Sequence, residues 1–570
     1  SDMHFVKKVP TTAEQKALME KERSVKLKNF CQLRDKIFTK RAQCEFDEEM
    51  LSLCEAVLVK NPDIYTLWNI RRETLERLKE RNQAGDTNVL EAEKLYHNEL
   101  GLTEQCIKAN PKSYSAWFQR SWILKRQRHP DLKKELAMCK EGLKMDCRNF
   151  HCWDHRRIVA KMAQLTDEEE IKFSEKLIAD NFSNFSAWHM RMSLISRFKD
   201  EKTGEKLMRA EDVKEEIKRV ANAIFTDPED ESAWMYARHI INLYSPASFL
   251  NKESACLIVP LSASISSNRL IVVFTRSTTV ENALTFFKGI PNDASWRAVS
   301  LFSSLTSRVW ECVFQGEEQV QISKDGEHFH SFTRFYRKDL YDRIMRGGSV
   351  DVIDTLREHC EELLQEENGN SLAVMTMTDC LRLTSPLESH DIIMENLNRL
   401  ATTLDPLRAN IYKSFADHER IRNHLLTKDD NGEGTKLDGI LEGEGRLSLA
   451  YLKLTELPHI EILAPFITDL DVRGNELKEW TEFGLVPLLT HLSIDENPMN
   501  CLPSSLASLS QLEFLSSSST LLTDVSTVGA SLLQCSSLKR FLYCQTPIVE
   551  KTNELRNITG DRIRLIPHYL

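Results

Sequence analysis

The stretch that decides the fold is Asp146-Cys147-Arg148-Asn149-Phe150-His151-Cys152-Trp153-Asp154-His155-Arg156-Arg157. Two histidines, two cysteines, two acids and three arginines within it suggest a metal or catalytic cluster. The same spacing of aromatic residues and arginine recurs elsewhere in the first 243 residues, which favours a structural repeat. Which of these two interpretations holds decides how the rest of the chain is understood.

The repeat centres on a tryptophan at positions 68, 117, 153, 188 and 234. In the second copy, Tyr114, Trp117 and Arg120 lie at offsets −3, 0 and +3, which places them on one face of a helix. An Asn-Pro or Asp-Pro pair precedes three of the copies, and proline disfavours helix for the residue before it. We expect the following repeat residues to support packing between hairpins: Trp68, Arg71, Trp117, Arg120, Trp153, Arg156, Trp188, Arg191, Trp234 and Arg238.

Each copy predicts a helical hairpin. A second apolar-periodic segment lies upstream of the tryptophan helix, as in residues 51–59 and 213–225. A single hairpin cannot bury its apolar face alone, so stacked hairpins are expected to form an α-solenoid with a continuous core. The tryptophans are 49, 36, 35 and 46 residues apart, which fits the 34-residue tetratricopeptide period poorly.

This pattern resembles the α subunits of protein prenyltransferases, whose repeats read Pro-x-x-Tyr-x-x-Trp-x-x-Arg. The resemblance implies a crescent of hairpins that wraps around a β subunit. In that family the β subunit is an α/α barrel that holds a zinc ion and the isoprenoid pocket. We therefore expect zinc as a cofactor of the partner subunit, and no metal site in this chain.

The pattern of apolar residues changes near residue 245 and predicts an inserted β domain. Short β-branched or aromatic runs follow one another, with turn residues such as Asn268 between them. This spacing is typical of a two-sheet, Ig-like sandwich of about 100 residues. The expected strands are residues 256–261, 270–275, 283–287, 309–314, 320–323 and 332–336.

Helical periodicity returns over residues 350–426, and a glycine-rich, acidic segment over 428–445 is a linker by composition. From residue 446 the segments 467–477 and 489–499 match the leucine-rich repeat, with Asn475 and Asn497 spaced by 22 residues. Residues 447–454, 512–522 and 538–546 fit weaker copies, with Thr520 at the asparagine position of the second. The side chain of this asparagine is expected to satisfy the backbone at the bend.

The fold class is therefore multidomain and mainly α. An α-solenoid of helical hairpins carries an inserted all-β Ig-like sandwich and is followed by a C-terminal α/β leucine-rich repeat domain. The expected boundaries are 1–243 for the hairpins, 244–348 for the sandwich, 349–430 for the resumed helices, 431–445 for the linker and 446–570 for the leucine-rich repeats.

This combination is similar to the branch of the prenyltransferase family that modifies Rab GTPases. The resemblance implies a heterodimeric, type II protein geranylgeranyltransferase, inactive without its β subunit. It would transfer geranylgeranyl from geranylgeranyl diphosphate to C-terminal cysteines of Rab GTPases, which a Rab escort protein delivers. The competing hypothesis is a non-enzymatic scaffold, because solenoids and sandwiches are common binding modules.

Composition excludes several other classes. A net charge of −10 argues against a general nucleic-acid binder, and no apolar run approaches the ~20 residues of a membrane span. The N-terminus lacks the layout of a signal peptide. Fourteen cysteines without a C-x-x-C pair fit a reducing compartment, so we expect the protein in the cytoplasm.

Two candidate sites fall within the opening stretch. His151 and His155 are spaced i, i+4, which could present both to zinc, but Cys152 stands where a metalloprotease has glutamate. Their neighbours occupy repeat positions that the other copies fill without this histidine pair, so we favour packing over a metal site. His4 stands on a polar leader and could at most reach a metal in a partner.

Arg148 is the better functional candidate. It precedes a helix, in the loop where the resemblance places a lysine near the isoprenoid diphosphate. Arginine keeps the charge and adds bidentate phosphate recognition, although it will not act as a proton donor. Asn149, Phe150 and His151 follow and are expected in the same substrate-facing loop. The alternative for Arg148 is a solvated loop arginine.

Overall fold

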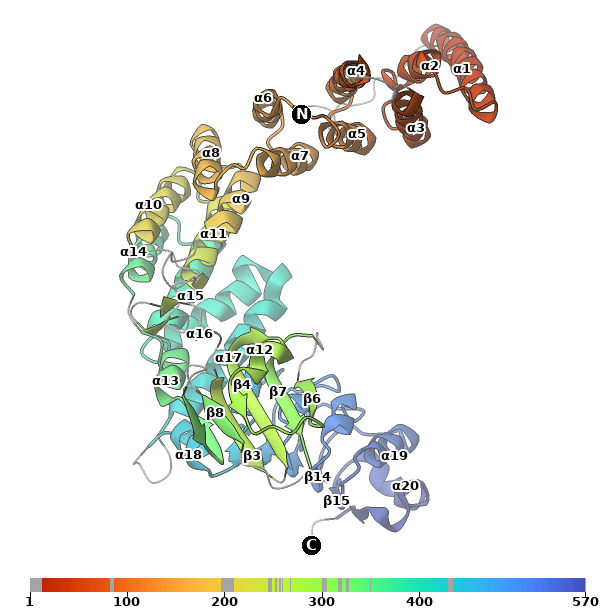
Figure 1. Ribbon diagram of the computed structural model, residues 1–570. Coiled ribbons are helices and arrows are strands. Elements are labelled where there is room, and N and C mark those ends of the chain that lie inside the picture. The colour runs from red at the N-terminus through yellow and green to blue at the C-terminus, as the bar shows by residue number, and fades with distance from the viewer. Residues whose placement is uncertain are drawn as a thin grey trace. The chain divides into compact units, whose positions relative to one another are not determined.

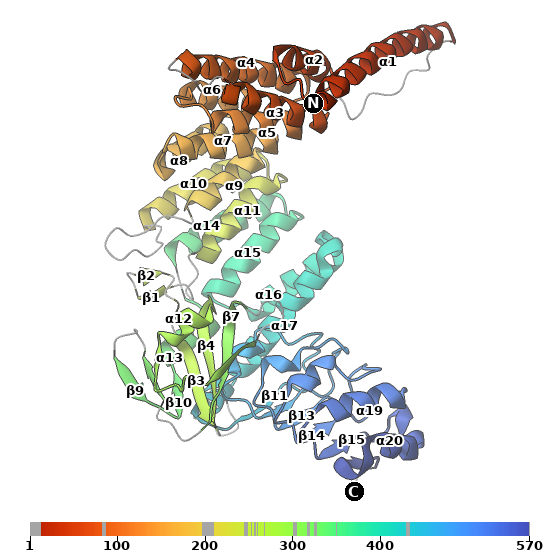
Figure 2. The same ribbon diagram turned by 45° about the vertical axis from the view of Figure 1, so that its right-hand side comes forward.

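The computed structural model describes residues 13–81, 87–195, 210–243, 249–251, 254–255, 258, 260–266, 268–299, 305–315, 320–323, 328–348, 350–428 and 434–568. The chain divides into two compact units, Ser1–Leu194 and Ile195–Leu570 (Figures 1 and 2). It is mainly a helical repeat solenoid, and the second unit also contains a separate β-rich region.

Unit 1 is a stack of helical hairpins, as the repeat predicts. A long first helix is followed by four pairs, and the second helix of each pair carries the repeat tryptophan (Figure 2). The helices are α1 Ala13–Ala42, α2 Glu48–Leu58, α3 Tyr65–Arg81, α4 Thr87–Ala109, α5 Tyr114–Leu124, α6 Leu132–Met145, α7 Phe150–Met162, α8 Asp167–Asp180 and α9 Phe185–Ile195.

Every repeat tryptophan is buried and makes the same hydrogen bond. Its indole Nε1–H donates to the backbone carbonyl six residues earlier, in the turn that ends the preceding helix. In α5 the bond joins Trp117 to Pro111 at 2.8 Å, and in α7 it joins Trp153 to Cys147 at 2.9 Å. The tryptophan therefore fixes the turn of its own hairpin as well as filling the core. The other copies pair Trp68 with Pro62, Trp188 with Phe182 and Trp234 with Pro228.

Four repeat arginines are buried and the fifth, Arg238, is half-buried; all five bind groups of neighbouring helices. Arg120 donates from Nε and Nη2 to the two carboxylate oxygens of Glu135, in α6, at 2.8 and 2.6 Å. It also donates to the carbonyl of Leu100, in α4, at 3.0 Å. One guanidinium thus joins the helix before its own to the helix after it. The carboxylate partners of the other copies are Glu99 for Arg71, Glu170 for Arg156 and Asp379 for Arg238. Arg191 donates to the carbonyl of Ile171, in the preceding helix, as Arg120 does to Leu100.

The aromatic residues at offset −3 do not join this core, although they share a helix face with the tryptophan. Tyr65, Tyr114, Phe150 and Phe185 are 60%, 70%, 50% and 42% exposed. They lie at the first residue of α3, α5, α7 and α9. Each hairpin of unit 1 therefore presents an exposed aromatic side chain at this repeat position.

In unit 2, the hairpin pattern continues across the β insert. Asn370 caps the start of α15 and donates to the Pro228 carbonyl at 3.0 Å, the same carbonyl that accepts from Trp234. The fifth and later hairpins therefore stack as those of unit 1 do, as expected for helices that resume after the insertion. The helices are α10 Ala210–Thr226, α11 Glu231–Leu243, α13 Lys338–Arg346, α14 Asp351–Glu366, α15 Ser371–Thr384, α16 His390–Arg399, η2 Leu400–Leu404, η3 Pro406–Arg408 and α17 Ala409–Leu426.

The insert forms antiparallel sheets. A five-stranded sheet has the order β10-β3-β4-β7-β6, and a three-stranded sheet has the order β5-β8-β9. The strand predicted at 283–287 is wrong, because Thr279 caps the short helix α12 (Val280–Leu284) there. Part of the strand expected at 256–261 lies outside the described residues. The strands are β1 Phe249–Asn251, β2 Ser254–Ala255, β3 Pro260–Ser266, β4 Arg269–Thr278, β5 Phe287–Lys288, β6 Ser295–Val299, β7 Ser307–Val313, β8 Gln321–Ser323, β9 Phe329–Ser331 and β10 Arg334–Tyr336.

The C-terminal part is built on a six-stranded parallel sheet. Each of the five predicted repeat copies supplies one short strand, and a sixth strand follows the last copy. Asn475 lies at the bend after a strand; its side-chain oxygen accepts from the backbone N–H of Leu454 at 3.0 Å and its amide donates to the carbonyl of Leu449 at 2.9 Å. This is the backbone role predicted for the repeat asparagine. The strands are β11 Arg446–Ser448, β12 Asp469–Asp471, β13 His491–Ser493, β14 Phe514–Ser516, β15 Arg540–Leu542 and β16 Arg564–Ile566.

Helical turns and short helices connect these parallel strands on one side of the sheet. They are η4 Ile460–Leu463, η5 Phe483–Leu485, η6 Ser504–Ser508, α19 Val525–Gln534, η7 Pro547–Lys551, α20 Thr552–Thr559 and η8 Gly560–Arg562.

The linker expected at 431–445 is corrected by the structure. Residues Lys436–Glu442 form the helix α18, which Thr435 and Asp438 start with a capping box. Its residues Leu437, Ile440 and Leu441 are buried in the hydrophobic cluster that also contains the β insert. The glycine content alone predicts a linker, but the three buried side chains make this segment part of the core.

Across the described residues, no helix is both long and apolar enough to cross a bilayer.

We predict that Arg120→Ala destabilises the α4–α7 stack by about 3–5 kcal/mol, because the substitution leaves the buried Glu135 carboxylate without its main partner. Hydrogen exchange of the α5–α7 amides measures this local loss. The matched control is Arg157→Ala, whose ion pair with Asp154 is exposed and contributes about 0–0.5 kcal/mol. Equal effects of the two substitutions would contradict the proposed role of the buried pair.

Candidate functional site

The site is built on the turn between α6 and α7. Asp146 ends α6, and Asn149 caps α7 by accepting from the backbone N–H groups of His151 and Cys152 at 3.1 and 3.3 Å. Because this cap starts the helix at Phe150, the expected loop of residues 148–151 is shorter than predicted. Phe150 and His151 belong to the first turn of α7, and only Arg148 and Asn149 remain before it.

Arg148 has the exposure that its proposed role requires. Its backbone N–H donates to Asp146 Oδ1 at 3.0 Å, which shapes the turn, while its side chain points away from the core as an exposed group. Among the residues that the structure describes, no hydrogen-bond or ion-pair partner holds its guanidinium. The charge is therefore available to an anion.

A second cation, which the sequence analysis missed, lies beside the same turn. Lys112 is exposed, and its Nζ lies 3.9 Å from Asp146 Oδ2. Lys112 and Arg148 each stand five residues before their repeat tryptophan, so they occupy the same place in successive hairpins. That common offset was the signal available in the sequence. The other copies have Asp63, Ser183 and Glu229 at this offset.

Asn149 and His151 do not face open solvent. Asn149 is buried, and its amide donates to the Pro111 carbonyl at 2.9 Å. The ring of His151 is 7% exposed and packs edge-on against Tyr114, with 4.2 Å between ring centroids. Of the four residues predicted to face a substrate, Arg148 and Phe150 are exposed, whereas Asn149 and His151 contact the preceding hairpin.

The histidine and cysteine side chains of the opening stretch contact different partners in the helix α7 and do not meet at one site. His155 contacts Glu135 and Ser121, and the Cys152 thiol lies 3.4 Å from the Cys139 carbonyl, which accepts its hydrogen bond. No group of three or more potential metal ligands gathers anywhere in the described ranges. Each candidate ligand therefore has a structural partner, which agrees with the packing interpretation. His4 lies outside the described residues.

His155 belongs to a buried chain of polar contacts. Its Nε2 lies 3.0 Å from Glu135 Oε2 and its Nδ1 lies 3.0 Å from Ser121 Oγ. A carboxylate only accepts, so Nε2 carries the proton and Nδ1 accepts from the hydroxyl. Burial lowers the pKa of His155, against the opposing effect of Glu135. Burial would raise the pKa of Glu135, but hydrogen bonds from His155 and Arg120 lower it to about 2.

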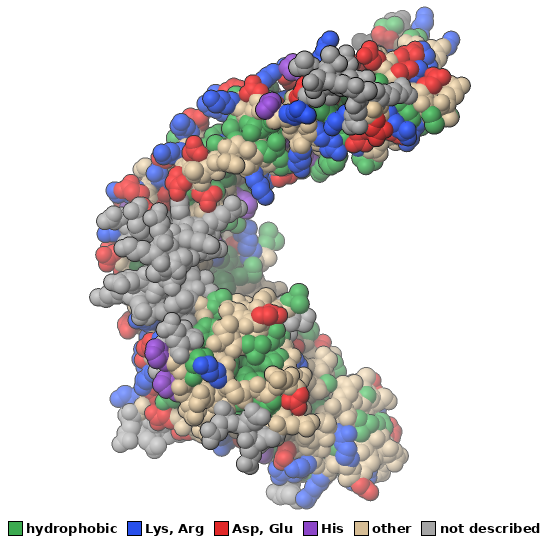
Figure 3. Space-filling model, in the orientation of Figure 1, with side chains coloured by type: hydrophobic (Ala, Val, Ile, Leu, Met, Phe, Trp, Pro, Cys, Tyr) green, Lys and Arg blue, Asp and Glu red, His purple; other side chains and the backbone are tan. Residues whose placement is uncertain are grey.

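An open groove of about 520 Å³ runs between α5 and α7. Its walls are mostly aromatic, from Tyr114, Trp117, Phe118 and Trp122 on α5, with His151 on α7 facing them. Figure 3 shows hydrophobic side chains at the surface of unit 1, with Lys, Arg, Asp and Glu side chains on both sides of them. The groove adjoins the turns that carry Lys112 and Arg148, so cations and exposed apolar surface occur together.

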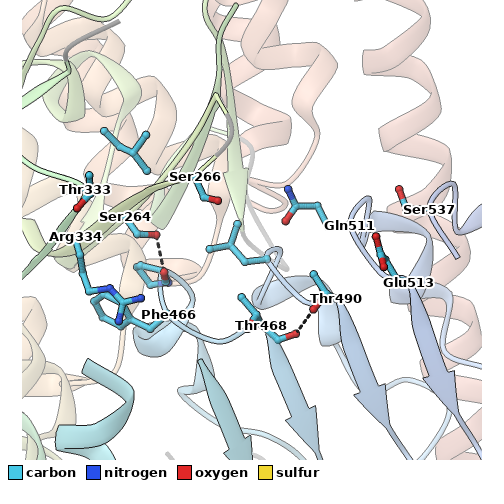
Figure 4. Close-up of a pocket in the computed structure, with 13 residues that line it drawn as sticks. Ser264, Ser266, Thr333, Arg334, Phe466, Thr468, Thr490, Gln511, Glu513 and Ser537 are labelled. Carbon is cyan, nitrogen blue, oxygen red and sulfur yellow. Dashed lines mark hydrogen bonds between the residues drawn. The ribbon is translucent and has the colours of Figure 1, made fainter. Parts of the chain in front are cut away.

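A second cavity, of about 600 Å³, lies in unit 2 between the β insert and the parallel sheet (Figure 4). Several of its hydroxyls already donate to carbonyls of its own wall; Ser264 donates to Pro465 at 2.5 Å and Thr490 to Thr468 at 3.0 Å. Arg334 and Glu513 lie at opposite ends of it (Figure 4). The cavity brings together no acid–base pair, and no site residue predicted from the sequence lines it.

The repeated bonds of the buried tryptophan and arginine define the class of protein. Residues 47–78, 96–127, 132–163, 167–198 and 213–244 match the family described as "Protein prenyltransferase alpha subunit repeat". These five segments contain the five tryptophan helices that the structure shows, so the chain has the α-subunit type of solenoid.

Relatives that align with most of the chain identify one family within this class. The chain is 30% identical over 554 residues to "Geranylgeranyl transferase type-2 subunit alpha" of Rattus norvegicus, covering 92% of this chain and 89% of the relative. It is 30% identical over 544 residues to the Homo sapiens protein of that name, covering 90% and 87%. A Dictyostelium discoideum protein of the same name is 36% identical over 247 residues, covering 42% of this chain and 75% of the relative. The chain belongs to the family of geranylgeranyl transferase type-2 α subunits.

We predict that the α5–α7 segment loses stability in two steps as the pH falls. Unfolded His155 gains a proton near pH 6.5, whereas the folded residue, with its lowered pKa, resists protonation, so stability falls as the pH drops through about 6.5. Glu135 adds a second loss below its unfolded pKa of about 4.3. The urea midpoint of this segment, followed by pulsed hydrogen exchange, measures both steps.

The control for this prediction is His155→Gln, which keeps an amide donor for Glu135 but does not titrate. It should abolish the step that begins near pH 6.5 and retain the step below about pH 4.3. A first step that persists in His155→Gln would show that another group causes it.

Proposed function

We propose that this chain is the α subunit of a heterodimeric, type II protein geranylgeranyltransferase. The enzyme would transfer geranylgeranyl from geranylgeranyl diphosphate to C-terminal cysteines of Rab GTPases, with a Rab escort protein delivering the substrate. The observation that carries this proposal is the alignment of 92% of the chain with a subunit of that name. The two exposed cations on successive hairpins, Lys112 and Arg148, supply the chemistry that the proposal needs from this chain.

Lys112 and Arg148 would act on the diphosphate. In the transfer, the substrate sulfur attacks C1 of the isoprenoid, the C1–O bond breaks, and pyrophosphate leaves with the electron pair. Negative charge grows on the leaving oxygens, and cations held near them stabilise that charge. Arg148 can offer two parallel N–H donors, and Lys112 offers a compact ammonium.

Zinc is proposed for the β subunit, where it would lower the pKa of the substrate thiol. His155 and Cys152 are committed to partners within the solenoid, and neither side chain gathers further ligands around it. This chain would therefore bind and orient the diphosphate, and its activity would depend on the partner.

The exposed aromatic row (Tyr65, Tyr114, Phe150 and Phe185) is proposed as part of the β-subunit interface. Aromatic residues are enriched in such interfaces, and exposed ones repeated at one place on each hairpin are costly without a partner. Phe150 lies two residues after Arg148, so a partner that covers the row would also approach the two cations. Obligate interfaces of this kind commonly exceed about 2,000 Å².

We propose the domain boundaries 1–243, 244–348, 349–430 and 446–570, with an Ig-like insert and C-terminal leucine-rich repeats. The in-register parallel strands and the bonds of Asn475 and Asn497 support the repeat assignment. The Dictyostelium discoideum relative aligns with only 42% of this chain, which supports a transfer function that needs neither added domain. The added domains would bind other proteins rather than nucleic acid or membrane, and the complex would act in the cytoplasm.

Co-expression with a prenyltransferase β subunit tests the proposal. The purified pair should form a stable one-to-one complex and move labelled geranylgeranyl to Rab in the presence of escort protein. Absence of both the complex and the transfer would favour a non-enzymatic scaffold.

We predict that Lys112→Ala and Arg148→Ala each raise the KM for geranylgeranyl diphosphate about tenfold in the heterodimer. The estimate follows from the loss of one charge-assisted hydrogen bond, about 1.5 kcal/mol. The control is Lys108→Ala, an exposed lysine of α4 paired with Glu104. Steady-state kinetics with varied diphosphate substrate measures the effect, and wild-type constants in both variants would make Arg148 an ordinary solvated arginine.

We predict that Tyr114→Ala with Phe150→Ala weakens heterodimer assembly at least tenfold while unit 1 stays folded, because both side chains are exposed in the isolated chain. Sedimentation or interferometry with the β subunit measures the affinity. Phe225→Ala, at a similarly exposed phenylalanine outside the aromatic row, is the control. If the double variant binds as tightly as wild type, the row is not the interface.

A further inference from the structure

An open pocket of about 280 Å³ lies in unit 2, where the helix α17 meets the first strand of the parallel sheet. Three segments line it: the first residue of α16, one face of α17 and the loop after β11. None of the described residues that line it is an aspartate or a glutamate. In a chain with a net charge of −10, a pocket whose charged side chains are all basic favours an anion as its ligand.

A buried carboxylate fixes one wall of this pocket. Asp417, in α17, is fully buried, and its Oδ1 accepts from Arg420 Nη1 at 2.6 Å. Its Oδ2 accepts from the backbone N–H of Thr455 at 2.8 Å and from that of Glu456 at 3.2 Å. One side chain therefore holds both the arginine and the loop after β11. The other nitrogens of Arg420 have no hydrogen-bond partner among the described residues, so they are available to a ligand.

The same loop presents Lys453 as an exposed side chain. Asn475, the repeat asparagine of the next copy, accepts from the backbone N–H groups of Leu452 and Leu454 at 3.1 and 3.0 Å. These two bonds fix the backbone on either side of Lys453, which has a left-handed φ of 57°. In the part of the chain that the structure describes, no acid pairs with its ammonium. The lysine thus stands on a fixed backbone with its charge uncompensated.

The cation is specific to the first leucine-rich copy. Lys453 follows the position that Asn475 and Asn497 occupy in the next two copies. The corresponding residues of the other copies are Glu476, Pro498, Leu521 and Pro547. A lysine at this place is therefore no part of the repeat pattern, and it occurs in the copy that packs against α17.

A further donor lines the pocket from α16. His390 is the first residue of this helix. Its Nδ1 is buried and has no hydrogen-bond partner in the described ranges. Buried polar atoms nearly always have a partner, so this nitrogen indicates a ligand. The side-chain amide of Asn423, on α17, also lines the pocket and can donate.

Two other groups at the pocket are already bound. His424 donates from Nε2 to the Ser448 carbonyl at 2.7 Å, which joins α17 to β11. Burial lowers the pKa of His424, and the charge of Lys436, whose Nζ lies 3.2 Å from the same nitrogen, lowers it further. The ring is therefore neutral at pH 7. Glu496 accepts from the Tyr451 hydroxyl at 3.0 Å and does not line the pocket.

We propose that this pocket binds a phosphorylated side chain of a partner protein. A phosphoserine or phosphothreonine carries nearly two negative charges and three strong acceptor oxygens at pH 7. Arg420 and Lys453 supply the positive charge, and charge-assisted hydrogen bonds of this kind are the strong ones. His390 and Asn423 add further N–H donors. This assignment does not depend on the transfer reaction.

The size of the pocket favours a single side chain as the occupant. Its volume of about 280 Å³ lies just below the roughly 300–1,000 Å³ of pockets that enclose drug-sized ligands. An anionic membrane surface is the other source of phosphate groups, but it attracts clusters of several lysines and arginines on an extended surface. The net charge of −10 disfavours that alternative.

Fluorescence anisotropy with the full chain and a labelled five-residue peptide with a central phosphoserine tests the proposal. The unphosphorylated peptide should bind about tenfold more weakly or worse. Lys453→Ala should raise the Kd of the phosphopeptide about tenfold, because one charge-assisted hydrogen bond is lost. Lys453→Arg keeps the charge and should stay within about twofold of wild type. Lys539→Ala, at an exposed lysine of the same sheet that pairs with Glu513, is the control and should leave the Kd unchanged.

His390→Phe distinguishes a built site from a general effect of charge. It keeps an aromatic ring but removes the unpartnered nitrogen, and the Kd of the phosphopeptide should rise about threefold. Equal affinity for the two peptides would overturn the proposal, as would wild-type affinity in Lys453→Ala. Binding of inorganic phosphate alone, or of vesicles that contain phosphatidylinositol phosphate but not of the phosphopeptide, would overturn the assignment to a protein partner.

Discussion

A buried arginine that needs a carboxylate in the next helix fixes the stacking of the hairpins. Arg120 bonds Glu135 in the following helix and the Leu100 carbonyl in the preceding one, so its hairpin fits between its neighbours in one register. Misplacement would leave charged groups buried and unpaired, which costs more than any single apolar contact gains. Trp117 fixes the turn of the same hairpin by bonding the Pro111 carbonyl. The apolar core follows these constraints.

The same register decides where chemistry can occur. Once adjacent hairpins stack in one way, equivalent positions of successive turns become neighbours. Asp146 therefore contacts residues at offset −5 of two copies, the Lys112 ammonium and the Arg148 backbone N–H, although 36 residues separate the two cations in the chain. The aromatic residues at offset −3 are exposed in each hairpin for the same reason. In the proposed function, the structural repeat brings two ordinary side chains to one diphosphate.

The sequence was sufficient for features that repeat and insufficient for features that depend on distance between repeats. Five copies of tryptophan and arginine predicted the hairpins, and Asn475 and Asn497 predicted the backbone bonds of the parallel strands. Lys112 was missed because its importance comes from a neighbour in the next hairpin. His151 was placed in an exposed loop because Asn149 was not recognised as a helix cap. The glycine and acidic composition predicted a linker over residues 436–442, whereas this segment forms the helix α18, which has a buried face.

The proposed function depends most on diphosphate binding by Lys112 and Arg148 together. A structure of the heterodimer with a non-hydrolysable geranylgeranyl diphosphate analogue tests it most directly. The predicted result places the Lys112 ammonium and the Arg148 guanidinium each within about 3 Å of diphosphate oxygens. A bound diphosphate that contacts only residues of the partner subunit, with both side chains in solvent, would contradict it.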